Sequence, residues 1–303
     1  MRGSGCVAGP GLARTPQIFG AVRRCGVARR SPLGSSTVTY PDAETLAAAG
    51  LRLDQSAEVV TISLARPDVR NAQTPATWRA LSAIGAALTP EVRVVVVRGD
   101  GPSFSAGIDR AAFTPEGLPG ERSLVDLAAL DDDELDAAIS EFQDGFSWCR
   151  RPELVTVAAV QGHAVGAGFQ LALACDLRVV ADDARFSMRE TSLGIVPDLG
   201  GTKPLVDLVG YSRALEICTT GRWVDAAEAR DLGIATAVVP AQRLDESVAD
   251  LVAALTAPLH GAVAATKQLL FTAGERPYED QLAAERAAQA VRLREVAEAF
   301  TRG

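Results

Sequence analysis

The stretch GHAVGAGFQLALACD, from Gly162 to Asp176, sets small residues in a turn that runs directly into an apolar segment. It follows LVTVAAV (154–160), a β-branched run typical of a strand buried on both faces. Such a turn aims unpaired backbone N–H groups and the positive end of a helix dipole at one point, which predicts a site for negative charge. One residue is out of character, because Gln170 stands alone among apolar neighbours.

The same alternation of strand and helix extends over most of the chain. Further strands are predicted at 59–65, 93–99, 177–181 and 236–240. Helices are predicted at 74–88, 212–221 and 225–233, the first with Thr at its N-cap and Pro at its first position, the others ended by Gly. This order is typical of a parallel α/β core, which we place at 46–240. From about 241 strand signals stop, so 241–303 is predicted to be a C-terminal helical region.

A second turn of small residues follows the predicted strand 93–99. In PSFSAGID (102–109) the residues Ser105, Ala106 and Gly107 permit a ligand to approach the backbone closely. One such turn alone is commonly no more than strand-to-helix packing, but two turns at strand ends can supply two converging N–H donors, as an oxyanion hole requires. A dinucleotide site is disfavoured, because GHAVGAG does not match G-x-G-x-x-G.

Composition excludes several classes of function. The net charge of −8 conceals six arginines and no acid in 1–41, so the remainder carries 24 basic against 38 acidic side chains, which disfavours a nucleic-acid partner. No apolar run approaches the length of a membrane span. The five cysteines form no C-x-x-C pair and only His163 and His260 are present, so neither a disulfide framework nor a metal site is predicted.

The Arg-rich head is predicted to be a disordered N-terminal extension at 1–45, and a mitochondrial transit peptide is the alternative. Two lysines accompany 28 arginines in the whole chain, a bias typical of GC-rich bacterial genomes. We therefore expect a cytoplasmic bacterial protein, or a mitochondrial one if the head is a true transit peptide.

Four motifs in order resemble the successive signatures of the enoyl-CoA hydratase/isomerase (crotonase) family, and the similarity covers roughly 57–300. They are FSAGID (104–109), VQGHAVGAGFQLALACDLRV (160–179), ARFSMRETSLGIVPDLGGT (184–202) and TTGRWVDAAEARDLGIATAVVP (219–240). The resemblance implies an α/β fold, a ββα superhelix with a C-terminal helical region, assembled as a homotrimer or a dimer of trimers. It also implies an acyl-CoA substrate and no cofactor, because coenzyme A is part of the substrate.

The resemblance assigns the two oxyanion-hole donors to the backbone N–H groups of Ile108 and Ala167, the latter in place of the family's usual glycine. When a proton leaves the carbon next to a thioester, negative charge forms on the carbonyl oxygen, and two aimed N–H groups stabilise it. The coenzyme A moiety is expected against RPDVRNA (66–72). The residues expected to contact it are Arg66, Arg70, Ala72, Ala106 and Lys267, with solvated surface charge as the alternative for the three cations.

Hydratases of this family use two glutamates, whose positions fall on Glu190 and Gln170. An amide cannot exchange a proton near neutral pH, so Gln170 disfavours hydration by two carboxylates. Isomerases that resemble this chain carry only the glutamate matching Glu190, and dienoyl-CoA isomerases add an aspartate at the position of Asp198. We therefore predict double-bond isomerisation with Glu190 as the acid/base, and place Asp198 and Gln170 in the same catalytic site.

Other interpretations stay open. Glu190 with Asp198 could hydrate an enoyl-CoA, or the chain could be an acyl-CoA binding protein that has lost catalysis. Asp198 could instead cap a turn, and Gln170 could be a satisfied structural amide. A ClpP-like peptidase would need a serine and a histidine at matching positions, and neither is present there. The segment 110–132 is predicted to line the acyl tunnel, because a long insertion of this kind is commonly functional or disordered.

Overall fold

The computed structural model describes residues 39–114 and 116–301. The Arg-rich head therefore lies almost wholly outside the described residues. The described part of the predicted extension includes the start of helix α1 (Ala43–Ala48), whose N-cap Asp42 accepts a hydrogen bond from the N–H of Thr45 at 2.7 Å. Leu46 of this helix is buried in the main core. The ordered core thus begins a few residues before the predicted boundary at 46.

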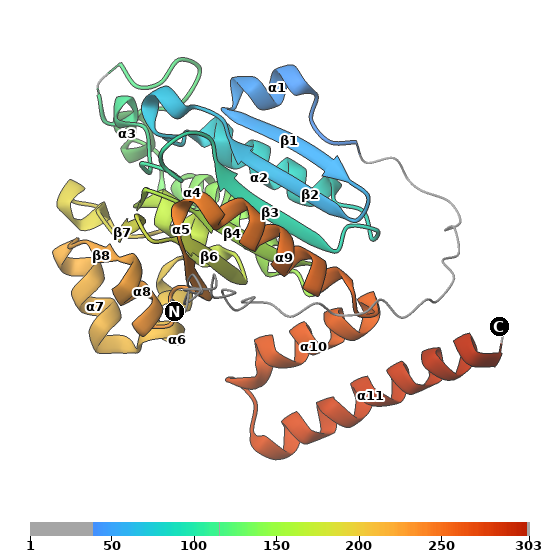
Figure 1. The fold of residues 1–303 in the computed structure, drawn as a ribbon. Helices are drawn as coiled ribbons and strands as arrows, with labels where there is room; N and C mark the ends of the chain where they lie inside the picture. The colour runs from blue at the N-terminus through green and yellow to red at the C-terminus, as the bar shows by residue number, and fades with distance from the viewer. Residues whose placement is uncertain (1–38, 115, 302–303) are drawn as a thin grey trace, which may run out of the picture.

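A six-stranded sheet forms the centre of the molecule (Figure 1). Its order is β1 (Leu51–Ser56), β2 (Val59–Leu64), β3 (Val94–Gly99), β4 (Val155–Val160), β6 (Leu177–Ala181) and β9 (Ala237–Val239). Strand β1 is antiparallel to β2, and the other neighbours are parallel. All five predicted strands are confirmed. Strand β1 escaped prediction because LRLDQS is half-polar and exposed along most of its length.

A second, smaller sheet carries the turns of interest. It consists of β5 (His163–Val165), β7 (Arg185–Ser187) and β8 (Val224–Asp225). These strands of two or three residues are too short to give a periodic signal. The chain passes from β4 into β5 through Gly162, where φ is +56° and an added Cβ would collide with the carbonyl oxygen of Pro102. Helix α5 (Ala167–Ala174) follows at once, so β4, β5 and α5 form one ββα unit.

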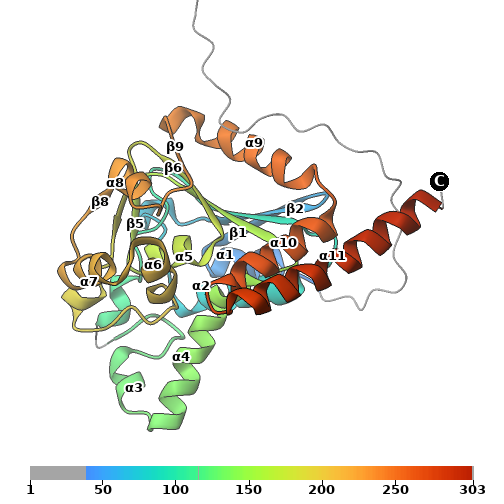
Figure 2. The same ribbon diagram turned by 90° about the horizontal axis from the view of Figure 1, so that it is seen from below.

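Helices cover both faces of the large sheet (Figure 2). On one face, Val95 and Val97 of β3 join the main core with α2 (Pro75–Ala87) and α4 (Asp132–Ser147). On the other face, Val94 and Val96 pack with α9 (Leu244–Thr256). Alternate residues of one apolar strand thus enter two cores, which confirms the prediction of strands buried on both faces.

The remaining helices are α3 (Leu124–Ala128), α6 (Thr202–Val209), α7 (Tyr211–Thr220), α8 (Ala226–Asp231), α10 (His260–Ala273) and α11 (Tyr278–Thr301). From Ala241 onward the described chain contains helices and no strand, as predicted. Helices α10 and α11 run beside each other away from the sheet, and neither has a buried residue (Figures 1 and 2). Within the described residues no single helix is long and apolar enough to cross a membrane, although the bent pair Ala241–Thr256 and His260–Ala273 passes that test by length and composition.

Candidate active site

Backbone pairing joins the two predicted turns. Ser105 and Ala164 form an isolated parallel bridge, in which the N–H of Ser105 donates to His163 at 2.8 Å and the N–H of Val165 donates to Ser105 at 3.0 Å. Gly107 then passes so close to β5 that an added Cβ would lie 2.5 Å from the carbonyl oxygen of Val165. Gly107 also has a φ of +87°, which a residue with a side chain rarely adopts. The turns therefore lie side by side.

The N–H groups of Ile108 and Ala167 are free to bind a ligand. The backbone N–H of Gln73 donates to the carbonyl of Gly107 at 2.7 Å, and the carbonyl of Gln73 accepts from the N–H of Asp109 at 2.8 Å. The N–H of Ile108, which lies between these two residues, therefore points away from Gln73. Ala167 is the first residue of α5, where a helix leaves its N–H groups unpaired. Neither N–H has an acceptor among the residues that the structure describes, and both residues line the same cavity.

Gln170 and Glu190 meet inside this cavity. The Nε2 of Gln170 donates to Oε1 of Glu190 at 2.7 Å. The Oε1 of the same amide accepts from the N–H groups of Leu199 at 2.9 Å and Gly201 at 3.2 Å. The Oε2 of Glu190 is buried and has no hydrogen-bond partner in the described part of the chain. The pair thus presents one unpaired carboxylate oxygen.

Burial sets the acidity of the two carboxyl groups. Burial raises the pKa of Glu190, and the negative charge of Asp198 adds to this, while the hydrogen bond from Gln170 acts in the opposite direction. Burial also raises the pKa of Asp198. A carboxylate removed from water holds a proton more tightly and is therefore a stronger base. Gly166 leaves room beside it, since an added Cβ would lie 3.3 Å from Oε1 of Glu190.

The cavity has a volume of about 590 Å³. It brings together predicted residues from four separate segments, namely Ala72, Ala106, Ile108, Ala167, Gln170, Glu190 and Asp198. Of the segment 110–132, Arg110 and Phe113 line this cavity, whereas Gly120, Glu121, Arg122 and Leu127 line a different one. The prediction that this segment borders the acyl site thus agrees with the structure only at its beginning.

Two of the predicted cations lie near the cavity mouth. Arg66 donates to the carbonyl of Ala72 and pairs with Asp109, both at 2.9 Å, so its guanidinium ties the 66–72 loop to the turn that carries Ile108. Arg70 is exposed, and its carbonyl accepts from the N–H of Ala106 at 2.8 Å. Arg66 is therefore engaged within the chain, and the guanidinium of Arg70 faces solvent.

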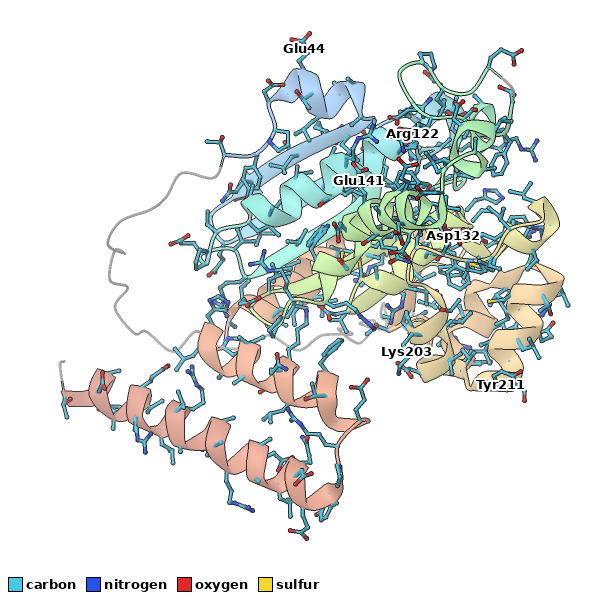
Figure 3. All side chains as sticks on the ribbon, turned by 180° about the vertical axis from the view of Figure 1, so that it is seen from behind. Glu44, Arg122, Asp132, Glu141, Lys203 and Tyr211 are labelled. Carbon is cyan, nitrogen blue, oxygen red and sulfur yellow. The ribbon has the colours of Figure 1, made fainter. Side chains whose placement is uncertain are left out.

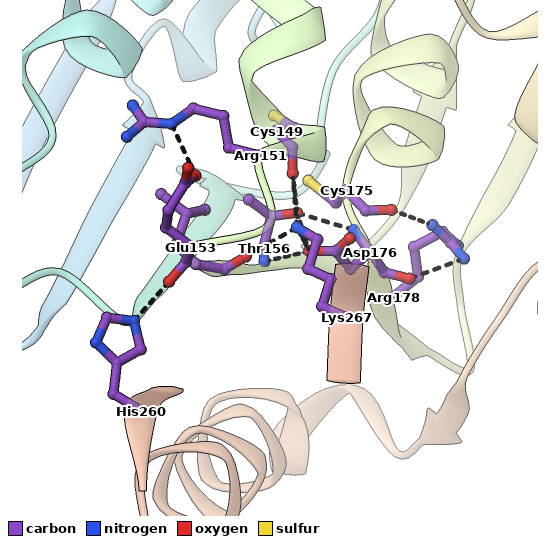
Figure 4. A network of polar contacts seen from close by, with 10 residues as sticks. Cys149, Arg151, Glu153, Thr156, Cys175, Asp176, Arg178, His260 and Lys267 are labelled. Atoms are coloured by element: carbon purple, nitrogen blue, oxygen red, sulfur yellow. Dashed lines mark hydrogen bonds and ion pairs between the residues drawn. The ribbon is translucent and has the colours of Figure 1, made fainter. Parts of the chain in front are cut away.

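Lys267 is not brought to this cavity. Its Nζ donates to the carbonyl of Leu154 at 2.8 Å and of Cys149 at 3.3 Å, and pairs with Asp176 at 2.8 Å (Figure 4). It lines a separate, largely apolar cavity of about 830 Å³ between the core and α10. The structure thus gives Lys267 contacts that hold α10 to the core, and places it apart from the other residues expected to contact coenzyme A.

Sequence reasoning missed three large side chains that line the cavity. Arg189 lies with its guanidinium carbon 5.2 Å from the ring centroid of Trp223, and Trp78 lies in α2. Arg189 and Trp223 stand inside the quoted motifs, but nothing in their local pattern marked them. No group of three or more His, Cys, Asp or Glu side chains able to hold a metal occurs in the described residues, and the expectation of no cofactor stays a prediction.

Comparison with known proteins gives a consistent result. A family model described as enoyl-CoA hydratase/isomerase matches residues 54–298. Among solved structures, one described as a putative enoyl-CoA hydratase from Thermobifida fusca YX in complex with acetoacetyl-CoA is 49% identical, with a TM-score of 0.82 over 85% of this chain and 100% of that chain. A second structure of that protein, in complex with CoA, is 48% identical, with a TM-score of 0.82 over 86% of this chain and 99% of that chain.

Curated relatives are named as hydratases, a dehydratase and an isomerase. The peroxisomal Delta(3,5)-Delta(2,4)-dienoyl-CoA isomerase of Arabidopsis thaliana is 32% identical over 64% of this chain and 69% of its own length. The carnitinyl-CoA dehydratase of Citrobacter koseri is 36% identical over 63% of this chain and 68% of its own length. With its predicted crotonase fold confirmed, the chain belongs to the enoyl-CoA hydratase/isomerase family of enzymes.

Proposed function

We propose that the protein moves the double bond of an enoyl-CoA thioester from the β,γ to the α,β position, with Glu190 as the only acid/base. The observation that carries this proposal is the hydrogen bond from Gln170 to Glu190, which leaves one carboxylate oxygen, Oε2, unpaired in the cavity. A single carboxylate suffices for a proton shuttle between two carbons of one substrate.

In this mechanism the thioester oxygen lies between the N–H groups of Ile108 and Ala167. Glu190 takes the proton from the α carbon, the electrons of that C–H bond form a dienolate, and the two N–H groups stabilise the charge on oxygen. Each donor lowers the barrier by about 3 to 4 kcal/mol, by analogy with single-donor deletions. Glu190 then returns the same proton to the γ carbon, and the electrons collapse to the conjugated thioester. No water and no second acid enter the balance.

Gln170 supports the isomerase assignment over two-carboxylate hydration. Its amide oxygen already accepts two backbone N–H groups, and its nitrogen donates to Glu190. An amide cannot act as an acid or base near neutral pH, and the oxygen of this one already accepts two hydrogen bonds and is not available to orient a water molecule.

Hydration by Glu190 with Asp198 is the second candidate. The carboxyl of Asp198 lines the same cavity, and its charge is close enough to raise the pKa of Glu190. Similar solved structures are also named as hydratases. Under this mechanism Asp198 replaces the acid that Gln170 cannot supply.

The two candidates are separated by steady-state assays with a β,γ-enoyl-CoA and an α,β-enoyl-CoA of equal chain length. Glu190→Gln is expected to lower kcat for isomerisation by about 10² to 10⁴, because it removes the base, while Asp198→Asn retains isomerisation. Hydration that exceeds isomerisation in wild type and is lost in Asp198→Asn would establish the second candidate. Acyl-CoA binding without turnover of either substrate would indicate a binding protein instead.

The wider assignments rest on the family. We propose that the backbone around Ala72 and Ala106 contacts the coenzyme A moiety, with Arg70 and Arg66 near its phosphates. The support is that both alanines line the cavity and that Arg70 is exposed beside them. Lys267 is left out, because it lines a separate cavity against α10 and not the one that Ala72 and Ala106 line. A homotrimer or dimer of trimers and a cytoplasmic location stay predictions.

A further inference from the structure

The residues that line the cavity differ sharply in exposure, which distinguishes its mouth from its floor. Val69, Leu193 and Trp223 are 40% to 48% exposed and lie at the mouth. Trp78 and Leu199 are 4% and 3% exposed, so they form the floor. Trp78 is the largest of the floor side chains.

Trp78 is fixed in place on several sides. Its Nε1 donates to Oε1 of Gln73 at 2.9 Å, and Nε2 of this fully buried amide donates to the hydroxyl of Ser105 at 3.0 Å. Helix α4 approaches at Gly145, where an added Cβ would lie 2.6 Å from the carbonyl oxygen of Trp78. An indole ring with a bonded nitrogen and a backbone packed this closely has little freedom to move aside for a ligand.

The position of Trp78 relative to the thioester is also fixed. Gln73, which holds the indole, is the residue whose backbone pairs on both sides of Ile108. Gln73 therefore links Trp78 of the floor, through its side chain, to the 102–109 turn that carries the donor Ile108, through its backbone. For a thioester oxygen bound by the N–H of Ile108, the distance to Trp78 is therefore set by the contacts of Gln73 and not by the exposed residues at the mouth.

Two aromatic rings pack against Trp78, and a cavity lined by charged side chains lies beyond one of them. The ring centroids of Phe142 and Phe146 lie 5.0 Å and 6.2 Å from that of Trp78. Phe142 borders a second cavity of about 500 Å³, in which Arg79 pairs with Glu121 at 2.5 Å and lies 4.0 Å from Glu141. Figure 3 shows Arg122 and Glu141 on this part of the molecule. A space lined by ion pairs is unfavourable for an alkyl chain.

We infer that Trp78 ends the acyl site and restricts the protein to short, apolar acyl groups. This inference rests on the proposed function only in requiring that an acyl-CoA occupies the cavity. It does not depend on whether isomerisation or hydration follows. Trp78 acts as a steric limit, and replacing it by a smaller side chain opens space toward Phe142 and Phe146.

The test measures binding of butanoyl-, octanoyl- and dodecanoyl-CoA by calorimetry, because these saturated thioesters bind without reacting. Wild type is expected to bind butanoyl-CoA most tightly. Trp78→Leu is expected to raise the affinity for dodecanoyl-CoA relative to butanoyl-CoA by about tenfold or more, since one or two methylene groups that gain apolar contacts have effects of this size. Trp78→Phe, which keeps an aromatic ring against Phe142, gives a smaller shift in the same direction and guards against a folding defect in the leucine variant.

The matched control is Trp148→Leu. Trp148 is 7% exposed, also lies in the main core, and its Nε1 donates to the carbonyl of Gly145 at 3.0 Å, but it does not line the cavity. Its variant should leave the ratio of affinities unchanged. Equal binding of dodecanoyl- and butanoyl-CoA by wild type, an unchanged ratio in both Trp78 variants, or the same shift in Trp148→Leu would each overturn the inference. Lack of turnover with the expected binding ratios would overturn the proposed function alone.

Discussion

The carboxylate of Glu190 and the amide of Gln170 come from different elements and meet in one hydrogen bond of 2.7 Å. The bond uses one carboxylate oxygen of Glu190 and leaves the other without a partner in the described part of the chain. In the proposed mechanism Gln170 therefore orients the carboxylate of Glu190 and does not itself transfer a proton. An ionised glutamate at this position could still accept from the N–H groups of Leu199 and Gly201, but it could not donate to Glu190. The identity of residue 170 therefore decides whether Glu190 accepts a hydrogen bond from an amide or lies beside a second carboxyl group.

The pH dependence of isomerisation tests this role. Burial raises the pKa of Glu190 above its ordinary value of 4.5. A base must be ionised, so activity is expected to rise with pH through this raised pKa. Gln170→Glu exchanges a donor for a like charge, which should move the acid limb of the pH–rate profile up by about one unit or more. Asp198→Asn removes a repulsive charge and should move the limb down. An acid limb that stays in place in Gln170→Glu would contradict the assignment.

At the scale of elements, the site depends on how the 102–109 turn meets β5. Three-residue strands contribute little by themselves, yet β5 fixes the start of α5 and thereby the N–H of Ala167. Gly107 is the residue that allows this contact, because both its φ of +87° and its approach to Val165 exclude a side chain. The sequence showed a run of small residues, and the pairing of the turns supplies the reason for them.

Gly107→Ala is expected to separate the two turns. The added methyl group strains the backbone and collides with the carbonyl oxygen of Val165. The N–H of Ile108 is then displaced from the thioester oxygen, so kcat should fall by about 10² or more. Gly210→Ala is a suitable control. Gly210 has a φ of +77° but no atom within 4 Å of an added Cβ, so this variant carries the backbone strain without the collision. Steady-state kinetics and thermal melts of both variants check the prediction, and equal losses of kcat would refute it.

At the scale of the whole molecule, a partly buried ion pair between Lys267 and Asp176 holds helix α10 to the core. Lys267 bonds Asp176 and two backbone carbonyls, and His260 at the start of α10 contacts the carbonyl of Glu153 at 2.6 Å (Figure 4). Asp176 also accepts from the N–H and hydroxyl of Thr156 at 2.7 and 2.9 Å. These contacts join α10 to the segment before β4 and to the loop between α5 and β6, which gives Lys267 a structural role; its contact with coenzyme A stays a prediction that the structure does not support.

Lys267→Met is expected to lower the free energy of unfolding by about 3 kcal/mol, at the lower end for buried pairs, because it leaves the partly buried carboxylate of Asp176 without its cation. The double variant with Asp176→Asn should recover part of that loss, since the neutral amide needs no counter-charge. Urea unfolding of the three proteins measures the effect. The KM for acyl-CoA is expected to stay nearly unchanged, and a large rise in KM with normal stability would return Lys267 to the coenzyme A site.

Much of the candidate site could be predicted because its residues lie in short motifs that can be recognised in the sequence. Small residues after a buried strand predicted the two turns, and the motif around Glu190 predicted the acid/base. The structure brings Ile108, Ala167 and Glu190 to one cavity. Trp78 could not be found in this way, because an apolar residue on the inner face of a helix gives the same signal whether it meets a core or a ligand.

The sequence by itself determined the parallel α/β architecture, the family and the positions of the two turns, because these follow from periodicity and from residues adjacent in the chain. The tertiary structure alone decided which atoms of Gln170, Lys267 and Trp78 are engaged. Their partners lie in segments distant in sequence, and a hydrogen bond or steric limit between such segments leaves no periodic trace. The sequence thus predicted a base and an oxyanion site, and only the packing showed that Oε2 of Glu190 has no partner in the described part of the chain and that Trp78 lies buried in the cavity wall.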